Sequence, residues 1–330
     1  MSDNSPKLKR FANPKEFTKS WYLLGKSKSL KPGNCELKKI FDKQFVVFRT
    51  ESGVVHVMEA RCPHMGAMLG AGEVVGECIR CPFHHWEFDG EGECTKVPYL
   101  DEPPARAKVK SYPVKEVYGG IWFFYGDEPL YPLPHFENLA KNNRTVLGPR
   151  RELVFHPHLI YPNTVDFNHW WAVHGIIVDR SSDFESVNKY QTQIELFGRL
   201  VDKPQTLSQK TFKFFRKTKF HWKASSFGGN VFLAEMILPI QFKFMLTYLP
   251  KIDGGCEVQT IYFFENSHWL KRVTGISLLT TIWKAFFVTL LFYDDMKIMN
   301  TIEFQTNFTK EDKLIGKWIQ HVQQLDYVEK

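Results

Sequence analysis

The chain has 330 residues, enough for one large domain or two of ordinary size, and 43% of them are hydrophobic, so it can bury a sizeable core. This composition excludes intrinsic disorder as the main state. A formal net charge of +7 is too small to indicate nucleic-acid binding, although it suits docking with an acidic partner protein. Six cysteines are too few for a disulfide scaffold, and the polar N-terminus lacks the hydrophobic segment of a secretory signal, so we expect a cytoplasmic protein.

The first part of the chain is predicted to be a polar, flexible tail over 1–16 followed by a β-rich domain over 17–128. Short runs of Val and aromatic residues, such as 44–48 and 120–125, are separated by Gly, Pro and charged residues, which is typical of a sandwich or barrel. The proline-rich stretch 129–134 interrupts helices and strands alike, so it is interpreted as a linker.

The second part, 129–330, mixes element types and predicts an α+β domain with a central antiparallel sheet. Several β-like runs occupy 187–264, and 309–327 has the pattern of an amphipathic helix. Aromatic residues make up 15% of the chain, which fits either a Phe-rich core or an apolar ligand cavity.

Two short motifs in the β-rich domain predict a four-ligand metal site. Cys62-Pro-His64 and Cys81-Pro-Phe-His84 each supply one thiolate and one imidazole. A zinc site and a Rieske [2Fe–2S] cluster, with two Cys on one iron and two His on the other, are the competing interpretations. Because each loop pairs Cys with His, and glycines and aromatics flank the loops, the cluster is favoured.

A second group of polar residues lies in the segment from Asn163 to His174, which also contains Asp166 and His169. On a helix Asp166 and His169 share a face, whereas His169 and His174 converge only where the helix is distorted or ends. Two His and one carboxylate form the facial triad of non-haem Fe(II) oxygenases, which leaves positions open for O₂ and substrate.

The motifs Cys-Pro-His-Met-Gly at 62–66, Cys-Pro-Phe-His-His-Trp-Glu-Phe-Asp-Gly at 81–90 and Asn-x-x-Asp-x-x-His-x-x-x-x-His at 163–174 resemble those of the Rieske non-haem iron oxygenases. These are the ring-hydroxylating oxygenase alpha subunits, and the resemblance is greatest to their ketosteroid-hydroxylase and cholesterol-desaturase-like branch. The chain departs from the family at His85, where Gly or Asp is usual. The resemblance implies an all-β Rieske domain over 17–128 and a catalytic domain over 129–330, whose antiparallel sheet is flanked by helices (helix-grip, START-like).

The resemblance also implies the cofactors and the residues that hold them. Cys62, His64, Cys81 and His84 are expected to bind the [2Fe–2S] cluster. His169, His174 and a downstream carboxylate are expected to bind mononuclear Fe(II). The family pattern near the C-terminus favours Asp295 as that carboxylate, because Ile298 follows it by three residues, with Asp294 as the alternative.

Two further residues receive roles. By resemblance, Asp166 connects His169 to His84 of the partner subunit, which requires a closed ring, most simply a homotrimer. Asn163 is expected either to hydrogen-bond near the iron or to cap a helix.

The expected function is that of an oxygenase component that uses O₂ to hydroxylate a hydrophobic sterol-, terpenoid- or polycyclic-like substrate. Electrons are expected from a separate ferredoxin and/or flavin reductase, because the chain has no nucleotide-binding motif and no plant-type ferredoxin Cys spacing. Desaturation and O- or N-dealkylation use the same metals and remain alternatives, as does an electron carrier without catalysis.

The apolar run 275–293 contains one charged residue, Lys284, and is close to the length of a membrane span. A buried or cavity-lining helix is one interpretation. A peripheral membrane contact with access to lipid-borne substrates is the other.

Overall fold

The computed structural model describes residues 8–139, 143–200, 219–237, 241–264, 293–305 and 307–329. These residues form two compact units: 19–132 with 328–329, and 133–327 with 8–18. The border therefore lies a few residues beyond 128/129, because 129–132 belongs with the first unit. Part of the predicted tail belongs to the second unit, where the Phe11 side chain is only 4% exposed and lies in the core.

The first unit contains three small antiparallel sheets, which accounts for the predicted pattern of short strands. The runs 44–48 and 120–125 both form strands, and most of their side chains are buried. In spatial order the sheets are β1 (Trp21–Lys26), β11 (Gly120–Phe124) and β10 (Val114–Val117); β2 (Cys35–Ile40), β3 (Lys43–Arg49), β4 (Val55–Glu59) and β9 (Ser111–Tyr112); and β5 (Glu73–Val75), β6 (Cys78–Arg80), β7 (Glu87–Phe88) and β8 (Cys94–Lys96).

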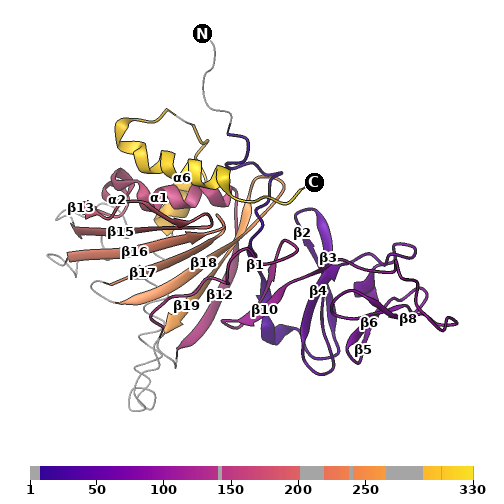
Figure 1. Cartoon of the computed structure of the whole chain (residues 1–330). Coiled ribbons are helices and arrows are strands. Elements are labelled where there is room, and N and C mark those ends of the chain that lie inside the picture. The colour runs from indigo at the N-terminus through magenta and orange to yellow at the C-terminus, as the bar shows by residue number, and fades with distance from the viewer. Residues whose placement is uncertain are drawn as a thin grey trace, which may run out of the picture. The chain divides into compact units, whose positions relative to one another are not determined.

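The second unit is built on one eight-stranded antiparallel sheet, with helices on one of its faces (Figure 1). The spatial order is β12 (Arg144–Leu153), β19 (Cys256–Phe264), β18 (Phe242–Pro250), β17 (Val231–Met236), β16 (Lys219–Phe227), β15 (Gln191–Leu200) and β13 (Ile176–Ser181), and β14 (Glu185–Asn188) pairs with β15. The helices are α1 (Ile160–Val165), α2 (Phe167–Ala172) and α6 (Lys313–Gln324), and residues 293–299 are also helical.

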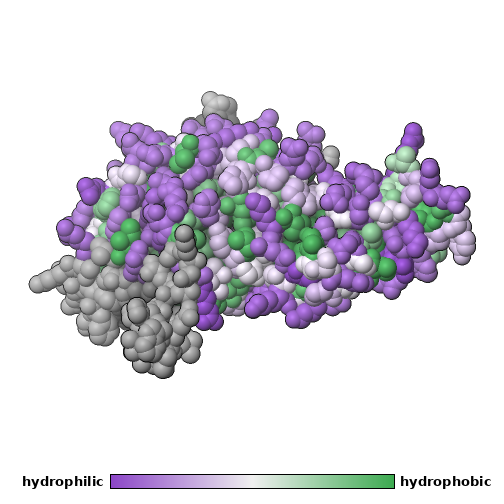
Figure 2. Space-filling view, turned by 60° about the horizontal axis from the view of Figure 1, so that its bottom comes forward, coloured by the Kyte–Doolittle hydropathy of each residue, from purple (hydrophilic) through white to green (hydrophobic). Residues whose placement is uncertain are grey.

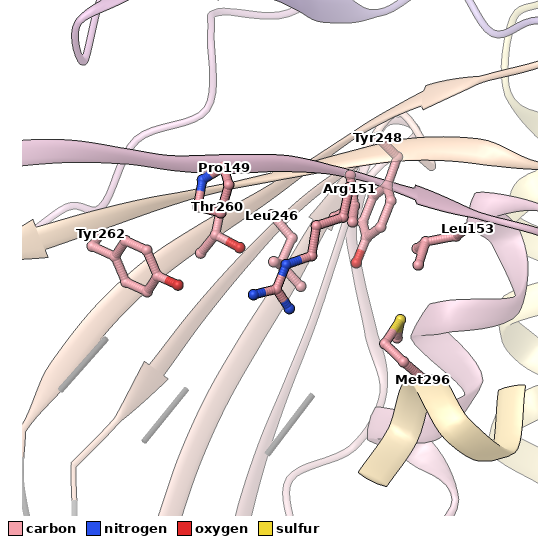
Figure 3. A pocket seen from close by; sticks show the side chains of 9 residues that line it. Pro149, Arg151, Leu153, Leu246, Tyr248, Thr260, Tyr262 and Met296 are labelled. Atoms are coloured by element: carbon pink, nitrogen blue, oxygen red, sulfur yellow. The ribbon is translucent and has the colours of Figure 1, made fainter. Parts of the chain in front are cut away.

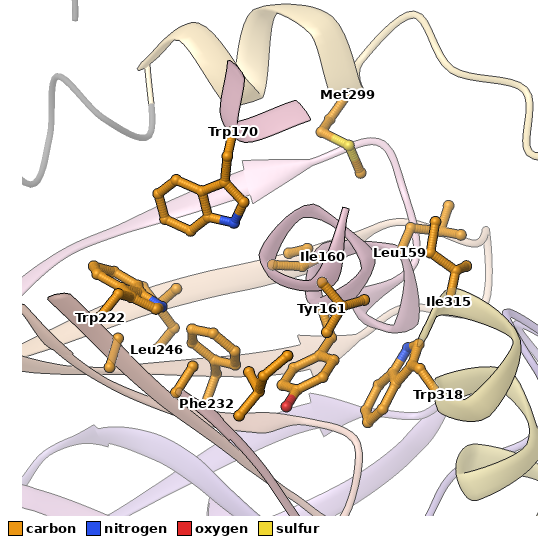
Figure 4. Close-up of a cluster of buried hydrophobic side chains, with 14 of the residues drawn as sticks. Leu159, Ile160, Tyr161, Trp170, Trp222, Phe232, Leu246, Met299, Ile315 and Trp318 are labelled. Atoms are coloured by element: carbon orange, nitrogen blue, oxygen red, sulfur yellow. The ribbon is translucent and has the colours of Figure 1, made fainter. Parts of the chain in front are cut away.

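The core of this unit lies between the sheet and the helices (Figure 4). On α6, Ile315, Trp318, Ile319 and Val322 are buried at the spacing of one helix face, as the amphipathic pattern predicts. Trp318 stacks on Tyr161 of α1 with ring centroids 4.4 Å apart, and its indole N–H donates to the carbonyl of residue 158. These contacts fix α1, and hence the segment that follows it, against α6.

The predicted run 275–293 lies outside the described residues except for its last position. Within the described residues, no helix is long and apolar enough to span a membrane. On the face drawn in Figure 2, hydrophobic residues form separate patches among hydrophilic ones.

Candidate metal centres

The two Cys-His motifs of the first unit fold into two loops with the same backbone hydrogen bonds. The N–H of Cys62 donates to the carbonyl of Ala67 at 2.9 Å, and the N–H of Cys81 donates to the carbonyl of Trp86 at 2.8 Å. Each motif follows closely after a strand, β4 or β6, so the sheets hold both loops at their starting points. The repeated motif in the sequence is therefore a repeated local structure.

The fifth residue of each loop has a left-handed backbone. Gly66 has a φ of +77° and His85 a φ of +58°, and the N–H of each donates back to the carbonyl of the cysteine that starts its loop. Glycine adopts this conformation freely, whereas a residue with a Cβ does so at a cost. The departure from the family pattern at His85 thus falls on a position where the backbone favours glycine.

The side chains of the two loops form one group of potential ligands. The Cys62 and Cys81 side chains are almost fully buried, while the His64 and His84 rings lie 4.6 Å apart nearer the surface. The His64 ring is stacked on Trp86, with centroids 4.5 Å apart and planes 4° apart. Two buried sulfurs behind two outer imidazoles match the donor set of a Rieske cluster.

The electrostatics of the thiols also fit a metal site. Burial, assisted by the neighbouring Cys81 sulfur, raises the pKa of the Cys62 thiol to about 11. Two adjacent buried thiolates are unfavourable without a compensating positive charge, which a bound metal supplies.

In the second unit, the motif 163–174 forms two short helices rather than one. The helical conformation is interrupted at Asp166, whose φ and ψ of −90° and 103° are extended. The Asp166 Oδ1 accepts hydrogen bonds from the backbone N–H groups of Asn168 at 2.9 Å and His169 at 3.1 Å, so this carboxylate caps α2. The single helix face that the spacing suggested for Asp166 and His169 is replaced by a cap.

The end of α2 brings the two histidines together. The helix ends at Ala172, and Gly175 has a left-handed φ of +66°, so His174 lies just beyond the helix. The His169 and His174 rings are consequently 5.0 Å apart at an angle of 81°. The two histidines therefore converge because the helix ends between them, one of the two conditions given by their spacing.

The carboxylate of Asp295, from the helical residues 293–299, completes the group. Its Oδ1 lies 3.0 Å from Nε2 of His169 and 3.0 Å from Nε2 of His174. The potential ligand atoms of the three residues all lie within 4.8 Å of one another. Asp295 is buried, whereas Asp294 is half-buried and lies outside this group.

The atoms of this group fit a metal ion better than they fit each other. Among the described residues, His169 Nε2 and Asp295 Oδ1 are buried without a hydrogen bond of normal geometry, despite their close approach. Buried polar groups are rarely left unsatisfied, and a shared cation would satisfy both. Burial by itself raises the pKa of Asp295, but the two histidines outweigh it and hold the pKa below its usual range.

An apolar cavity of about 530 Å³ opens at these three residues. Its walls come from the helices and the sheet, and Asn163 of α1 is one of its few polar lining residues. The other described lining residues are Ile160, Thr164, Trp170, Trp222, Phe232, Phe244, Leu246 and Met296.

A paired Cys-His loop domain, followed by a sheet-and-helix unit with a buried two-His, one-carboxylate group, defines a class of Rieske protein with a second metal centre. Residues 20–113 match the Rieske [2Fe-2S] domain family. A cholesterol 7-desaturase of Drosophila melanogaster is 32% identical over 328 residues, which cover 92% of this chain and 74% of that protein. The chain belongs to the Rieske non-haem iron oxygenases, in the branch that includes the cholesterol 7-desaturases.

Other curated relatives match over shorter stretches. A cholesterol 7-desaturase of Ciona intestinalis is 37% identical over 41% of this chain and 30% of its own length. The oxygenase component of a 3-ketosteroid-9-alpha-monooxygenase of Rhodococcus rhodochrous is 34% identical over 37% of this chain and 32% of its own length. In these alignments the chain spans about a third of the relative.

Solved structures confirm the predicted fold class. Dicamba monooxygenase bound to dicamba has a TM-score of 0.67 at 20% identity, over 93% of this chain and 96% of that one. The complex between oxygenase and ferredoxin in carbazole 1,9a-dioxygenase gives 0.66 at 16% identity, over 96% and 94%. The match to the Rieske [2Fe-2S] domain family agrees with the predicted cluster.

Proposed function

We propose that this chain is the oxygenase component of a Rieske non-haem iron system that oxidises a hydrophobic substrate with O₂. The observation that carries the proposal is the buried group of His169, His174 and Asp295 at the wall of an apolar cavity, in the same chain as a Rieske domain. An electron carrier has no use for a second metal group beside a small-molecule cavity.

Each group of residues has a separate task in this proposal. Cys62, Cys81, His64 and His84 hold the cluster, and the buried sulfurs keep it shielded on one side. His169, His174 and Asp295 would hold Fe(II), and iron bound there would supply the activation of O₂.

The cavity residues bind and orient the substrate. Trp170, Trp222 and Phe232 form apolar walls that exclude water and hold a reacting C–H near the metal group. Asn163, which lines the same cavity, offers an amide to a polar atom near the metal group. Apolar walls with few polar groups suit a sterol-, terpenoid- or polycyclic-like molecule, because burying an unpaired polar group costs roughly 1–3 kcal/mol.

Asp166 is proposed to link the two centres across a subunit interface of a homotrimer. Its Oδ1 is used in capping α2, while among the described residues its Oδ2 accepts no hydrogen bond. That oxygen is thus available to an imidazole N–H such as that of His84 of the partner subunit. Capping by Oδ1 would also hold the carboxylate in a fixed position relative to His169.

The proposed electron donor is a ferredoxin, with or without a flavin reductase. The support is that the similar carbazole 1,9a-dioxygenase structures contain an oxygenase with a ferredoxin. The similar proteins are named as monooxygenases, dioxygenases and desaturases, so hydroxylation is the leading reaction and desaturation or dealkylation the alternatives.

The test is a reconstituted reaction with purified protein, a surrogate ferredoxin and its reductase. We expect sterol-like compounds to stimulate O₂ consumption. The mass of the product then identifies the reaction, because hydroxylation adds about 16 mass units and desaturation removes about 2. The Asp295→Ala variant is the control, since it should keep the Rieske spectrum and lose this stimulation. A wild-type protein that carries cluster but neither binds mononuclear iron nor consumes O₂ with any substrate would contradict the proposal.

A further inference from the structure

A second cavity, of about 490 Å³, adjoins the metal-site cavity. Figure 3 shows the side chains that line it. The two cavities have two lining residues in common, Leu246 of β18 and Met296, which follows the metal-group residue Asp295. An elongated ligand in the metal-site cavity would therefore reach the second cavity by passing these two flexible side chains.

The walls of the second cavity include several hydrogen-bond donors. Figure 3 shows the guanidinium of Arg151 and the hydroxyls of Tyr248 and Tyr262 pointing into the space between the sheet and Met296. Thr260 adds a further hydroxyl. None of the described lining residues is acidic.

The position of Arg151 is set by a bulge in β12. The pairing of β12 with β19 shifts register between Leu147 and Arg150, and Arg151 then lies opposite Val258. At Gly148, inside the bulge, an added Cβ would come within 3.1 Å of the Tyr262 ring, so the backbone approaches this ring closely. After the bulge, alternate residues face the cavity, which places Arg151 on the same side as Pro149 and Leu153.

Arg151 is exposed to solvent, where a free guanidinium is ordinary, whereas two nearby cations are paired. Arg150 points to the other side and pairs with Glu257 at 2.9 Å, and Lys251 pairs with Glu152 at 2.9 Å. Among the described residues, Arg151 has no ion pair. A guanidinium donates in a planar fork that matches a carboxylate, and it has no acceptor capacity of its own.

Tyr248 brings a second donor to the cavity wall. The residue is only 4% exposed, and Figure 3 shows its hydroxyl pointing into the cavity. Burial raises the pKa of Tyr248 far above its usual range, so the hydroxyl stays protonated and can donate. An acceptor atom of a ligand in this cavity would accept a hydrogen bond from it.

We infer that the second cavity binds the far end of the substrate, and that this end carries an oxygen acceptor, with a carboxylate as the best fit. The inference rests on the proposed function, because it treats the metal-site cavity as the place of reaction. Arg151 and Tyr248 act as specificity-determining residues that fix which carbon of the apolar body lies at His169, His174 and Asp295.

The test measures binding of two matched probes to the metal-loaded protein. Cholanic acid is a steroid whose sole polar group is a carboxylate at the end of its side chain, and its methyl ester keeps the oxygen acceptors without the charge. We expect Arg151→Gln to weaken binding of the acid by about 10- to 100-fold, as expected for loss of a charge-assisted pair, with Arg151→Lys in between. Tyr248→Phe should weaken both probes by several-fold, and the matched control Arg150→Gln should change neither.

The outcomes separate the possible ligands and the two proposals. Dependence on Arg151 for the acid alone identifies a carboxylate as the acceptor, and dependence for both probes identifies a neutral carbonyl; either result supports the inference. Equal affinity of wild type and Arg151→Gln for both probes overturns it. Substrate-stimulated O₂ consumption is measured in parallel: its absence from wild type would reject the proposed function, whereas its presence with an inert Arg151 would reject only this inference.

Discussion

The two metal centres of this protein are built in different ways. In the first unit, two short loops with the same hydrogen bonds each provide a cysteine and a histidine, so each half of the site is formed locally. In the second unit, His169 and His174 lie at the end of α2, while Asp295 comes from a helical segment more than a hundred residues later. The first centre depends on loop conformation, and the second depends on the packing of α1, α2 and 293–299 against the sheet.

The largest expected effect tests the local centre. Cys62→Ser or Cys81→Ser removes one of two buried sulfurs, and oxygen is a poor substitute for thiolate in an iron–sulfur cluster. We expect loss of the Rieske visible absorption and of acid-labile sulfide, together with loss of turnover. Cys256→Ser is the matched control, because Cys256 is buried but belongs to the second unit and should leave the spectrum unchanged. A Cys62→Ser protein with a normal Rieske spectrum would contradict the ligand assignment.

The next largest effect tests the centre of the second unit, whose ligands lie far apart in the sequence. His169→Ala, His174→Ala or Asp295→Ala should leave the Rieske spectrum intact but remove the mononuclear iron and reduce turnover to background, because two ligands alone do not form the facial site. Iron content per cluster and substrate-dependent O₂ consumption measure the two outcomes. Asp294→Ala is the control, since Asp294 lies outside the group of three. If this variant loses the iron and Asp295→Ala keeps it, the register of the third ligand is wrong by one.

Asp166 has two roles, as the cap of α2 and as the proposed link between the two metal centres, and two variants separate them. Asn caps helices about as well as Asp, so Asp166→Asn should keep stability and both metals while electron transfer between them slows severely. Asp166→Ala should show the same slowing and in addition lose about 1 kcal/mol of unfolding free energy with the cap. Single-turnover oxidation of the reduced cluster, with substrate and O₂ present, measures the transfer. A normal rate of electron transfer in Asp166→Asn would show that Asp166 caps α2 but does not link the two centres.

The same contrast explains which features could be predicted from sequence. The ligands of the first centre are recognisable from sequence because each Cys-His pair lies within one short loop, so its spacing along the chain determines its local geometry. Asp295 is marked in the sequence by a family pattern around Ile298 rather than by its distance from His169. The face on which Arg151 lies depends on the register shift after Leu147, and Phe11 joins the core through contacts with distant elements, so neither placement is visible in local patterns.

The smallest expected effect compares the two loops with each other. Gly66 and His85 occupy equivalent left-handed positions, but only Gly66 has the residue that this backbone favours. A left-handed residue with a Cβ costs roughly 1–2 kcal/mol, whereas glycine loses more chain entropy on folding by about 0.5–1 kcal/mol. His85→Gly should therefore stabilise the first unit by up to about 1 kcal/mol, and Gly66→Ala should destabilise it by about the same amount. Denaturant unfolding followed by the Rieske absorption measures both changes, and the exposed position of His85 keeps packing losses small. If His85→Gly instead destabilises the unit, the imidazole makes a favourable interaction that outweighs the backbone cost, and the two loops are less equivalent than their hydrogen bonds indicate.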